Sequence, residues 1–508
     1  MLNKKILCVG NETEHTDILV GQLAKENQTT NHGLVISENF VPIKNGYYHT
    51  SIADIPAGDI VLSLAKHFDS VKMLNQTIDS YPHDKSFVHT FRLMINLEKQ
   101  GYVTDFRNNI NNKNILYWYD LLHTNKSFCL IPFMTLSNDY GYATLCFKNA
   151  LPITRIKDIT DWSTDPMFAP IRNNLVAGIN MPDKCNVCYE REQAGGESAR
   201  QFESLEWALR LRLNDVQDAK QIKDPVVYDI RPSNKCNIMC RMCDDKHSHL
   251  IEDEYKKIGW QTNTDMWKLQ PFPYEKINYD TVERIYWAGG DPTVMPEFYS
   301  FLRDCIKNNQ VDFDLNIGTN GQKISDRLWN LLKEFPRVTF NISIDGYKKI
   351  NDYIRWLSDF DSIRANCFKI QEAGHILSFQ TVFSMWNATR IHEIFEFYDR
   401  DFPGCNTLVQ PAGNLNNHMG PWHNPLREQV LESMYRSKQT KVCYNNGRNT
   451  EHLLDEMINF YTNYDYDPII FSKFLKYNDT LDRVRNSRLA DYIPELEQSR
   501  VLLSKCTS

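Results

Sequence analysis

Short apolar runs alternate with amphipathic stretches from about residue 224 onward. The runs predict buried β-strands, and the stretches, in which apolar residues recur every three or four positions, predict helices. Segments Pro296–Asn308 and Asp326–Phe335 have this helical spacing. Since strand–helix–strand repeats build parallel sheets, the pattern predicts an α/β fold with a partial (β/α)6 barrel over residues 224–412 and its chemistry at the carboxyl ends of the strands. The six expected strands are Val226–Arg231, Glu283–Ala288, Phe313–Ile317, Val338–Ile344, Phe379–Met385 and Thr407–Gln410.

The first 107 residues have a similar but weaker pattern. Ile6–Val9 and Ile60–Leu64 are expected to be strands, and Asp17–Lys25 and Phe87–Gln100 have helical spacing. Residues 1–107 are therefore predicted to form a small α/β domain, and nothing in its sequence indicates what it does.

Three further segments complete the chain. The asparagine-rich residues 108–114 are expected to be a linker before a second, cysteine-bearing module at 115–200. A charged helical stretch, Glu203–Lys223, then connects this module to the barrel. Residues 413–508 are polar and aromatic, and are expected to be a mainly helical extension that serves as a lid or a docking surface.

Composition narrows the class of protein. Of 508 residues, 42% are hydrophobic and 24% charged, a normal globular mix. The net charge of −7 gives no general attraction to nucleic acid or anionic membranes, and no apolar run approaches the ~20 residues of a membrane span. The 13 cysteines are an odd number without an export signal, which favours a reducing cytoplasm over a disulfide framework.

Three cysteines stand directly after the first predicted barrel strand. Cys236, Cys240 and Cys243 have the spacing C-x3-C-x2-C. A structural zinc site stays possible, but zinc normally takes four ligands in a closed tetrahedral site. Three thiolates without an obvious fourth suit a [4Fe–4S] cluster with one iron left open, at the mouth of the barrel.

This spacing resembles the radical S-adenosylmethionine (SAM) superfamily, and a second motif follows in the same order. Gly289-Gly290-Asp291-Pro292 comes after the second predicted strand, where the family usually has Gly-Gly-Glu-Pro. The resemblance implies that this segment lies against the amino group and methionine backbone of SAM. Two glycines let the main chain approach a ligand closely.

Later motifs are similar to the peptide-modifying branch of that superfamily. Asn320 lies in a Thr-Asn-Gly sequence after the third strand, and Ser343 ends the fourth. The resemblance implies that Ser343 and Arg355, twelve residues on, contact the carboxylate and ribose region of SAM. A guanidinium is a natural bidentate partner of a carboxylate. Asn387, after the fifth strand, is also similar to relatives.

A second set of cysteines lies upstream of the barrel. It comprises Cys129, Cys146, Cys185 and Cys188. Four thiolates can close a zinc site, which spacing alone slightly favours, or a fully ligated [4Fe–4S] cluster. The region resembles the SPASM module in its shortened, twitch form, through Ile131-Pro132-Phe133 and the closing C-x2-C. Here the module precedes the barrel instead of following it. The resemblance implies an auxiliary cluster for electron transfer, and the alternative is a cluster that only staples the module.

The resemblance implies a radical SAM enzyme that cleaves SAM reductively to a 5′-deoxyadenosyl radical. This radical abstracts hydrogen from a peptide or protein substrate, and a reductase or ferredoxin-type protein supplies the electron. The alternatives are dehydrogenation of a small molecule and, in another class, a non-enzymatic metal-cluster scaffold. No catalytic side chain can be named from the sequence. His247 and His249 are expected to be exposed polar positions at a helix start, and Cys305 and Cys367 core residues of helices.

Overall fold

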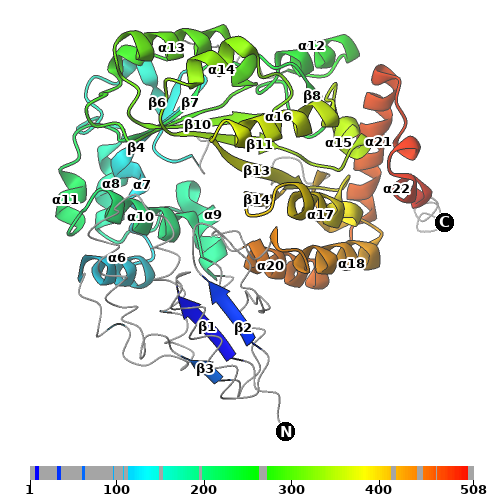
Figure 1. Cartoon of the computed structure of the whole chain (residues 1–508), viewed down its shortest axis with the longest axis horizontal. Coiled ribbons are helices and arrows are strands. Elements are labelled where there is room, and N and C mark those ends of the chain that lie inside the picture. The colour runs from blue at the N-terminus through cyan, green and yellow to red at the C-terminus, as the bar shows by residue number, and fades with distance from the viewer. Residues whose placement is uncertain are drawn as a thin grey trace. The chain divides into compact units, whose positions relative to one another are not determined.

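The computed structural model describes residues 113–500 apart from 148–152, 194–196, 263–271, 413–418, 443–449 and 465 (Figure 1). Before residue 113 it describes positions 95 and 107 and three short strands. These are β1 (Ile6–Gly10), β2 (Asn31–Val35) and β3 (Ile60–Leu62), in a parallel sheet of order β2-β1-β3. Both strands predicted there are confirmed. The predicted helices Asp17–Lys25 and, but for one residue, Phe87–Gln100 lie outside the described residues.

The chain divides into two compact units. Unit 1 comprises residues 1–131, 172–221 and 443–452, and unit 2 comprises residues 132–171, 222–442 and 453–508. Each is described by itself below.

Unit 1 contains, besides the small sheet, helices α6 (Lys113–Thr124), α9 (Pro182–Gln193), α10 (Ala199–Arg210) and α11 (Val216–Lys220). A capping box starts α10, because the Ser198 hydroxyl accepts a hydrogen bond from the Gln201 amide. The buried Arg200 donates to the carbonyls of Leu122 and Phe128, and pairs with Glu192 at 2.7 Å. This one side chain therefore ties together α6, α9, α10 and the segment just before Cys129.

Unit 2 is built on a nine-stranded sheet of order β14-β13-β11-β10-β9-β7-β4-β5-β6. Strands β7, β9, β10, β11, β13 and β14 are parallel neighbours in sequence order, as expected for repeated βα units. All six predicted strands are confirmed within three residues. They are β7 (Val227–Arg231), β9 (Arg284–Trp287), β10 (Asp314–Thr319), β11 (Val338–Ser343), β13 (Ile376–Phe383) and β14 (Asn406–Pro411).

Strands from the predicted second module belong to this sheet. β4 (Thr135–Asp139) pairs in parallel with β7, and β5 (Tyr142–Thr144) and β6 (Thr154–Arg155) continue the sheet in antiparallel fashion. The Val226 amide also donates to the Met134 carbonyl at 2.9 Å, just ahead of the paired residues. Five consecutive partners along β7 join residues 135–139 to the core. The segment 115–200 is therefore divided between the two units.

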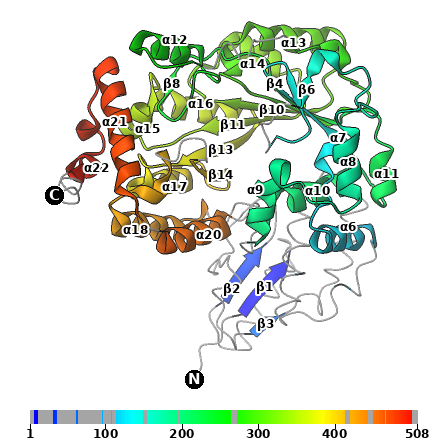
Figure 2. The same ribbon diagram turned by 180° about the vertical axis from the view of Figure 1, so that it is seen from behind.

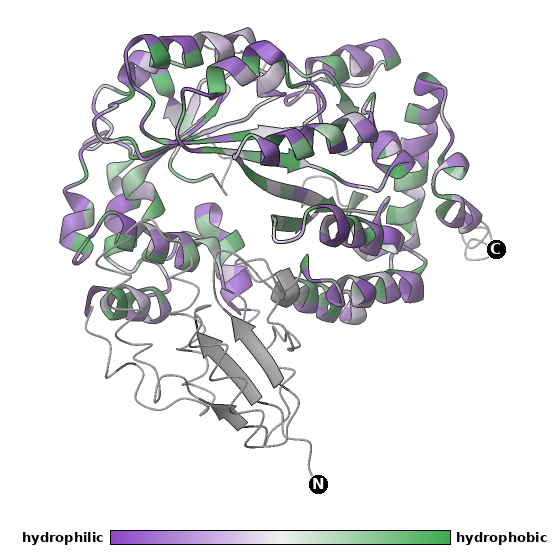
Figure 3. Ribbon diagram, viewed as in Figure 1, coloured by the Kyte–Doolittle hydropathy of each residue, from purple (hydrophilic) through white to green (hydrophobic). Residues whose placement is uncertain are grey.

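Helices cover one face of the sheet. Side chains along β10, β11 and β13 alternate between buried and half-buried, and Trp287 of β9 packs on Phe298 and Phe301 of α13. The views from both sides place α13, α14, α16 and α17 along the outside of the sheet, and hydropathy alternates along them (Figure 2, Figure 3). The half-buried positions of these strands, which point to the other face, carry polar side chains such as Asn316, Asn341 and Gln380.

The helices of this part of the chain are α12 (His249–Ile258), α13 (Pro296–Lys307), α14 (Asp326–Leu332), α15 (Lys349–Ile354), α16 (Phe360–Glu372) and α17 (Ile391–Asp401).

The C-terminal extension is mainly helical, as predicted. It contains α18 (Arg427–Lys438), α20 (Thr450–Asn463), α21 (Pro468–Arg485) and α22 (Pro494–Gln498). Phe471, Phe474 and Leu475 of α21 share one hydrophobic core with Tyr353 and Trp386 of the βα units. The extension is thus fixed to the core by apolar burial. None of the described helices is long and apolar enough to cross a membrane.

Candidate functional site

The three cysteines of the first set lie on the loop between β7 and α12. Cys240 belongs to the two-residue strand β8 (Met239–Cys240), which pairs antiparallel with β12 (Arg355–Trp356). The pairing sets Arg355 opposite Cys240, and the Arg241 amide donates to the Ile354 carbonyl at 2.7 Å. The loop is thus held at the carboxyl end of β7 by residues that follow β11.

The thiols of Cys236, Cys240 and Cys243 are free, and they lie close enough for their charges to influence one another. Burial raises the pKa of Cys236 to about 12, with the charges of Asp291 and Cys240 adding to the rise. Burial, followed by the charges of Cys240, Asp244 and Cys236, also raises the pKa of Cys243. Within the described residues, no three His, Cys, Asp or Glu side chains are already arranged to hold a metal ion. Iron–sulfur clusters are held by cysteine thiolates, so these three side chains are suitable ligands. Because the ligands must be deprotonated, cluster binding would release protons.

The predicted glycine pair lies directly against this loop. Gly289 has φ +123°, and a Cβ there would come within 2.5 Å of the Ser233 carbonyl oxygen. A Cβ on Gly290 would come within 2.0 Å of the Lys235 carbonyl oxygen. The Gly290 amide donates to Ser233 at 3.0 Å. The two glycines therefore allow the turn after β9 to pack closely against the main chain just before Cys236.

Asp291 and Asn320 are joined to each other. The buried Asp291 carboxylate accepts from the Asn320 amide at 2.7 Å and from the Thr319 and Thr293 hydroxyls. The Asn320 side-chain amide donates to Asn237 Oδ1, inside the cysteine loop, at 2.8 Å. The two residues thus connect the ends of β9 and β10 to the loop.

Arg355 is buried and pairs with Asp345 at 2.6 Å. Its Nη1 lies 3.7 Å from Cys240 Sγ, and its Nε has no hydrogen-bond partner among the described residues. Burial lowers the pKa of Arg355, but the charges of Asp345 and Cys240 outweigh it and the net shift is upward. The guanidinium therefore has a carboxylate partner within the protein and one nitrogen left over for a ligand.

Two other predicted residues lie nearby. Ser343 ends β11, two residues before Asp345, and is half-buried. The Asn387 amide donates to the carbonyls of Asp345 and Val382 at 2.9 and 2.7 Å, so it fixes the turn after β11.

Sequence reasoning missed two residues at this site and was wrong about a third. His249, expected to be an exposed polar position, is half-buried, and its Nδ1 accepts from the Cys236 amide at 3.2 Å. No role was expected for Asp345, although it stands two residues after Ser343 in the sequence Ser343-Ile344-Asp345-Gly346. Arg241 lies between the second and third cysteines and is fully buried. Its position inside the motif was the one signal that could have singled it out.

The second cysteine set is divided between the units. Cys129, Cys185 and Cys188 belong to unit 1 and Cys146 to unit 2. Cys185 and Cys188 are half-buried on α9, so their C-x2-C spacing lies on a helix. Burial raises the pKa of Cys185, a hydrogen bond with Tyr189 opposes this, and the charge of Cys188 adds to the rise. Ser204 Oγ lies 3.9 Å from Cys129 Sγ.

The segment that carries the first site matches a known family model. The family model "Radical SAM superfamily" matches residues 230–398, less than half of the chain but including every residue of the first site named above. An uncharacterized protein of Methanothermobacter thermautotrophicus is 27% identical over 192 residues, which are 36% of this chain and 66% of that protein.

Two solved structures are similar at low identity. Streptococcus suis SuiB bound to S-adenosylmethionine is 16% identical, with a TM-score of 0.28, over 48% of this chain and 55% of SuiB. A structure titled anSMEcpe with bound AdoMet is 16% identical, with a TM-score of 0.31, over 41% of this chain and 58% of that chain. SuiB is also matched in its complex with the precursor peptide SuiA. The chain thus spans little more than half of these two proteins.

Proposed function

We propose that this chain is a radical SAM enzyme in which Cys236, Cys240 and Cys243 hold a [4Fe–4S] cluster. The observation that carries the proposal is the loop itself: three free thiols whose charges act on one another follow β7, the first of the six strands in the repeated βα units. The ends of the next strands meet around this loop, through Gly290 and Asn320. Once reduced by a donor protein, such a cluster would supply one electron to bound SAM, which would split into methionine and a 5′-deoxyadenosyl radical.

The residues of this chain would bind and orient SAM. Arg355 lies beside Cys240 through Nη1, and its Nε, which has no partner among the described residues, could donate to the carboxylate of SAM. Ser343 lies on the same side, at the end of β11. The main chain at Gly289, Gly290 and Asp291 would present the carbonyls for the amino group. Burial of Arg355 and partial burial of the three cysteines would limit the access of water to the bound molecule.

A peptide or protein side chain is the proposed substrate. The half-buried positions of β10, β11 and β13 carry amide side chains such as Asn316, Asn341 and Gln380, which can hydrogen-bond a hydrophilic substrate. Dehydrogenation of a small molecule is the alternative. An auxiliary [4Fe–4S] cluster on Cys129, Cys146, Cys185 and Cys188 is proposed to take an electron from the substrate radical.

Metal analysis after anaerobic reconstitution tests the proposal. Wild type is expected to hold about eight irons per chain, and the Cys236/Cys240/Cys243→Ala variant about four. Cys305→Ala/Cys367→Ala, which changes two buried cysteines on α13 and α16, is the matched control and keeps all of its iron. A positive result is followed by assay of 5′-deoxyadenosine. Zinc in the wild type, or iron unchanged in the triple variant, would instead support the non-enzymatic scaffold.

A further inference from the structure

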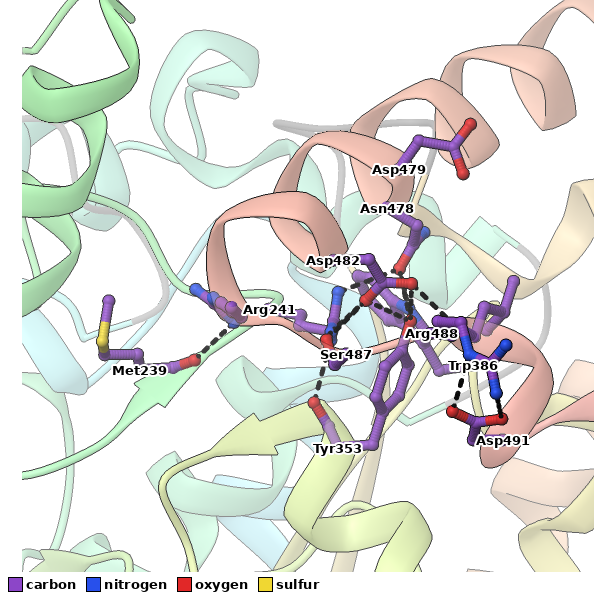
Figure 4. A network of polar contacts seen from close by, with 12 residues as sticks. Met239, Arg241, Tyr353, Trp386, Asn478, Asp479, Asp482, Ser487, Arg488 and Asp491 are labelled. Atoms are coloured by element: carbon purple, nitrogen blue, oxygen red, sulfur yellow. Dashed lines mark hydrogen bonds and ion pairs between the residues drawn. The ribbon is translucent and has the colours of Figure 1, made fainter.

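Arg241 is buried inside the cysteine motif, and both of its terminal nitrogens are held by the C-terminal extension. Its Nη2 donates to Asp482 at 2.6 Å and to Ser487 Oγ at 2.9 Å, and its Nη1 donates to Asn478 at 3.4 Å (Figure 4). Its side chain is fully buried, and that of Asp482 is 12% exposed. A charge with no access to water needs such a partner, because burying it alone is costly.

Tyr353 completes the support of the Arg241 guanidinium. The guanidinium carbon lies 3.6 Å from the centre of the Tyr353 ring, and Nε donates to the Tyr353 carbonyl at 2.9 Å. The Tyr353 hydroxyl donates to the same Asp482 carboxylate at 3.1 Å. Asp482 therefore binds both the cysteine loop and the helix α15 that leads to Arg355.

Two further side chains of α21 hold the main chain of the loop. The Tyr477 hydroxyl donates to the Arg241 carbonyl at 2.6 Å. Arg485 Nη1 donates to the Met239 carbonyl at 3.0 Å, while its other nitrogens pair with the buried Glu254 of α12. The residues on both sides of Cys240 are thus tied to one helix about 240 residues later in the chain.

We infer that α21 is a positioning element of the cluster site, and that Asp482, acting through Arg241, fixes Cys240 and Cys243 for cluster binding. This inference rests on the proposed function for the identity of the cluster. The ion pair also fixes the local charge, because Arg241 would lie beside a bound cluster with its charge balanced by Asp482.

The first test needs no cluster and uses the full chain before reconstitution. Asp482→Asn is expected to raise hydrogen exchange of the backbone amides at residues 239–243 about tenfold, while the amides of β10 and β11 exchange as in wild type. Asp491→Asn is the matched control. It removes the exposed ion pair between Asp491 and Arg488, in the segment just after α21, and should leave the exchange of the amides at residues 239–243 unchanged.

The second test separates positioning from mere loosening. In reconstituted protein, Asp482→Asn leaves Arg241 unbalanced and should raise the cluster's reduction potential, whereas Arg241→Gln leaves Asp482 unbalanced and should lower it. A loosened loop alone would shift both variants in the same direction.

Unchanged exchange at residues 239–243 in folded Asp482→Asn protein would overturn the inference. If that variant does not fold, Ser487→Ala decides, since it removes only the hydroxyl that Arg241 donates to and should raise exchange of the same amides by a smaller factor. Failure of the wild type to take up iron would overturn the proposed function, and the exchange result would still decide the role of α21.

Discussion

Arg355 and Cys240 are paired across a two-residue antiparallel ladder, with Arg355 Nη1 3.7 Å from Cys240 Sγ. The position of the arginine therefore depends on the cysteine loop as well as on helix α15, which ends at the residue before it. Its second partner, Asp345, accepts from the Val382 amide at 2.7 Å, so the pair also connects β11 to β13.

Replacing Arg355 by Ala should destabilise the protein by about 3 kcal/mol, because it leaves the fully buried Asp345 carboxylate unpaired. Thermal or denaturant unfolding measures this. The double variant Asp345→Asn/Arg355→Ala should recover part of the loss, since no buried charge is then stranded. Iron uptake should stay at the wild-type level in both variants while SAM binding falls. Normal SAM affinity in either variant would contradict the proposed role of Arg355.

Gly290→Ala should disrupt the cysteine loop, because the new Cβ would be forced against the Lys235 carbonyl carbon and oxygen. We expect a loss of about 2 kcal/mol or more in the free energy of unfolding, together with reduced iron uptake. Gly404→Ala is the control. It has φ +82° and nothing within 4 Å of the new Cβ, so its cost is limited to backbone strain of about 1 kcal/mol and iron uptake is kept. Equal iron uptake in the two variants would count against a role for Gly290 in shaping the loop.

Asp291→Asn should be more harmful than its small change in size suggests. Both carboxylate oxygens accept hydrogen bonds, and Oδ2 receives the Asn320 amide and the Thr319 hydroxyl. An amide group in either orientation sets an N–H against one of these donors, at a cost of about 1–3 kcal/mol. The fall in melting temperature should come with faster exchange of the Asn320 amide. An unchanged melting temperature would show that Asp291 does not hold the end of β10.

Glu495 should contribute to stability in a pH-dependent way. Burial raises its pKa, but hydrogen bonds from Arg390 and Thr389 outweigh this, so the folded-state pKa lies below the ordinary value of about 4.3. Its contribution is therefore complete above pH 4.3 and is lost as the pH falls through the lower, folded value. Glu495→Gln should cost less than about 1 kcal/mol at pH 7, since the carboxylate is partly exposed, and almost nothing near pH 2. A difference in unfolding free energy that is constant from pH 7 to pH 2 would refute this.

Much of the core could be predicted from the sequence, because its strands and helices have strongly periodic patterns. The order of strands β7 to β14 followed from the repeated βα units, and the cysteine loop, the glycine pair and Arg355 followed from motifs at the ends of those strands. The position of β4 could not be predicted in this way. All five of its side chains are buried, so Thr-Leu-Ser-Asn-Asp shows no alternation, and its partner β7 is about 90 residues away. The pairing of Arg241 with Asp482 is equally non-local, since nothing near either residue indicates the other.

The parallel pairing of β4 with β7 also limits how the protein can be shortened. A fragment that started at residue 222, where the predicted barrel begins, would leave β7 as an edge strand with a row of unsatisfied backbone donors and acceptors, a template for aggregation. A fragment of unit 2 that keeps residues 132–171 would retain β4 and cap the sheet with the short antiparallel strands β5 and β6. The smallest form of the core that folds on its own is therefore expected to include sequence from both sides of the α9–α11 segment.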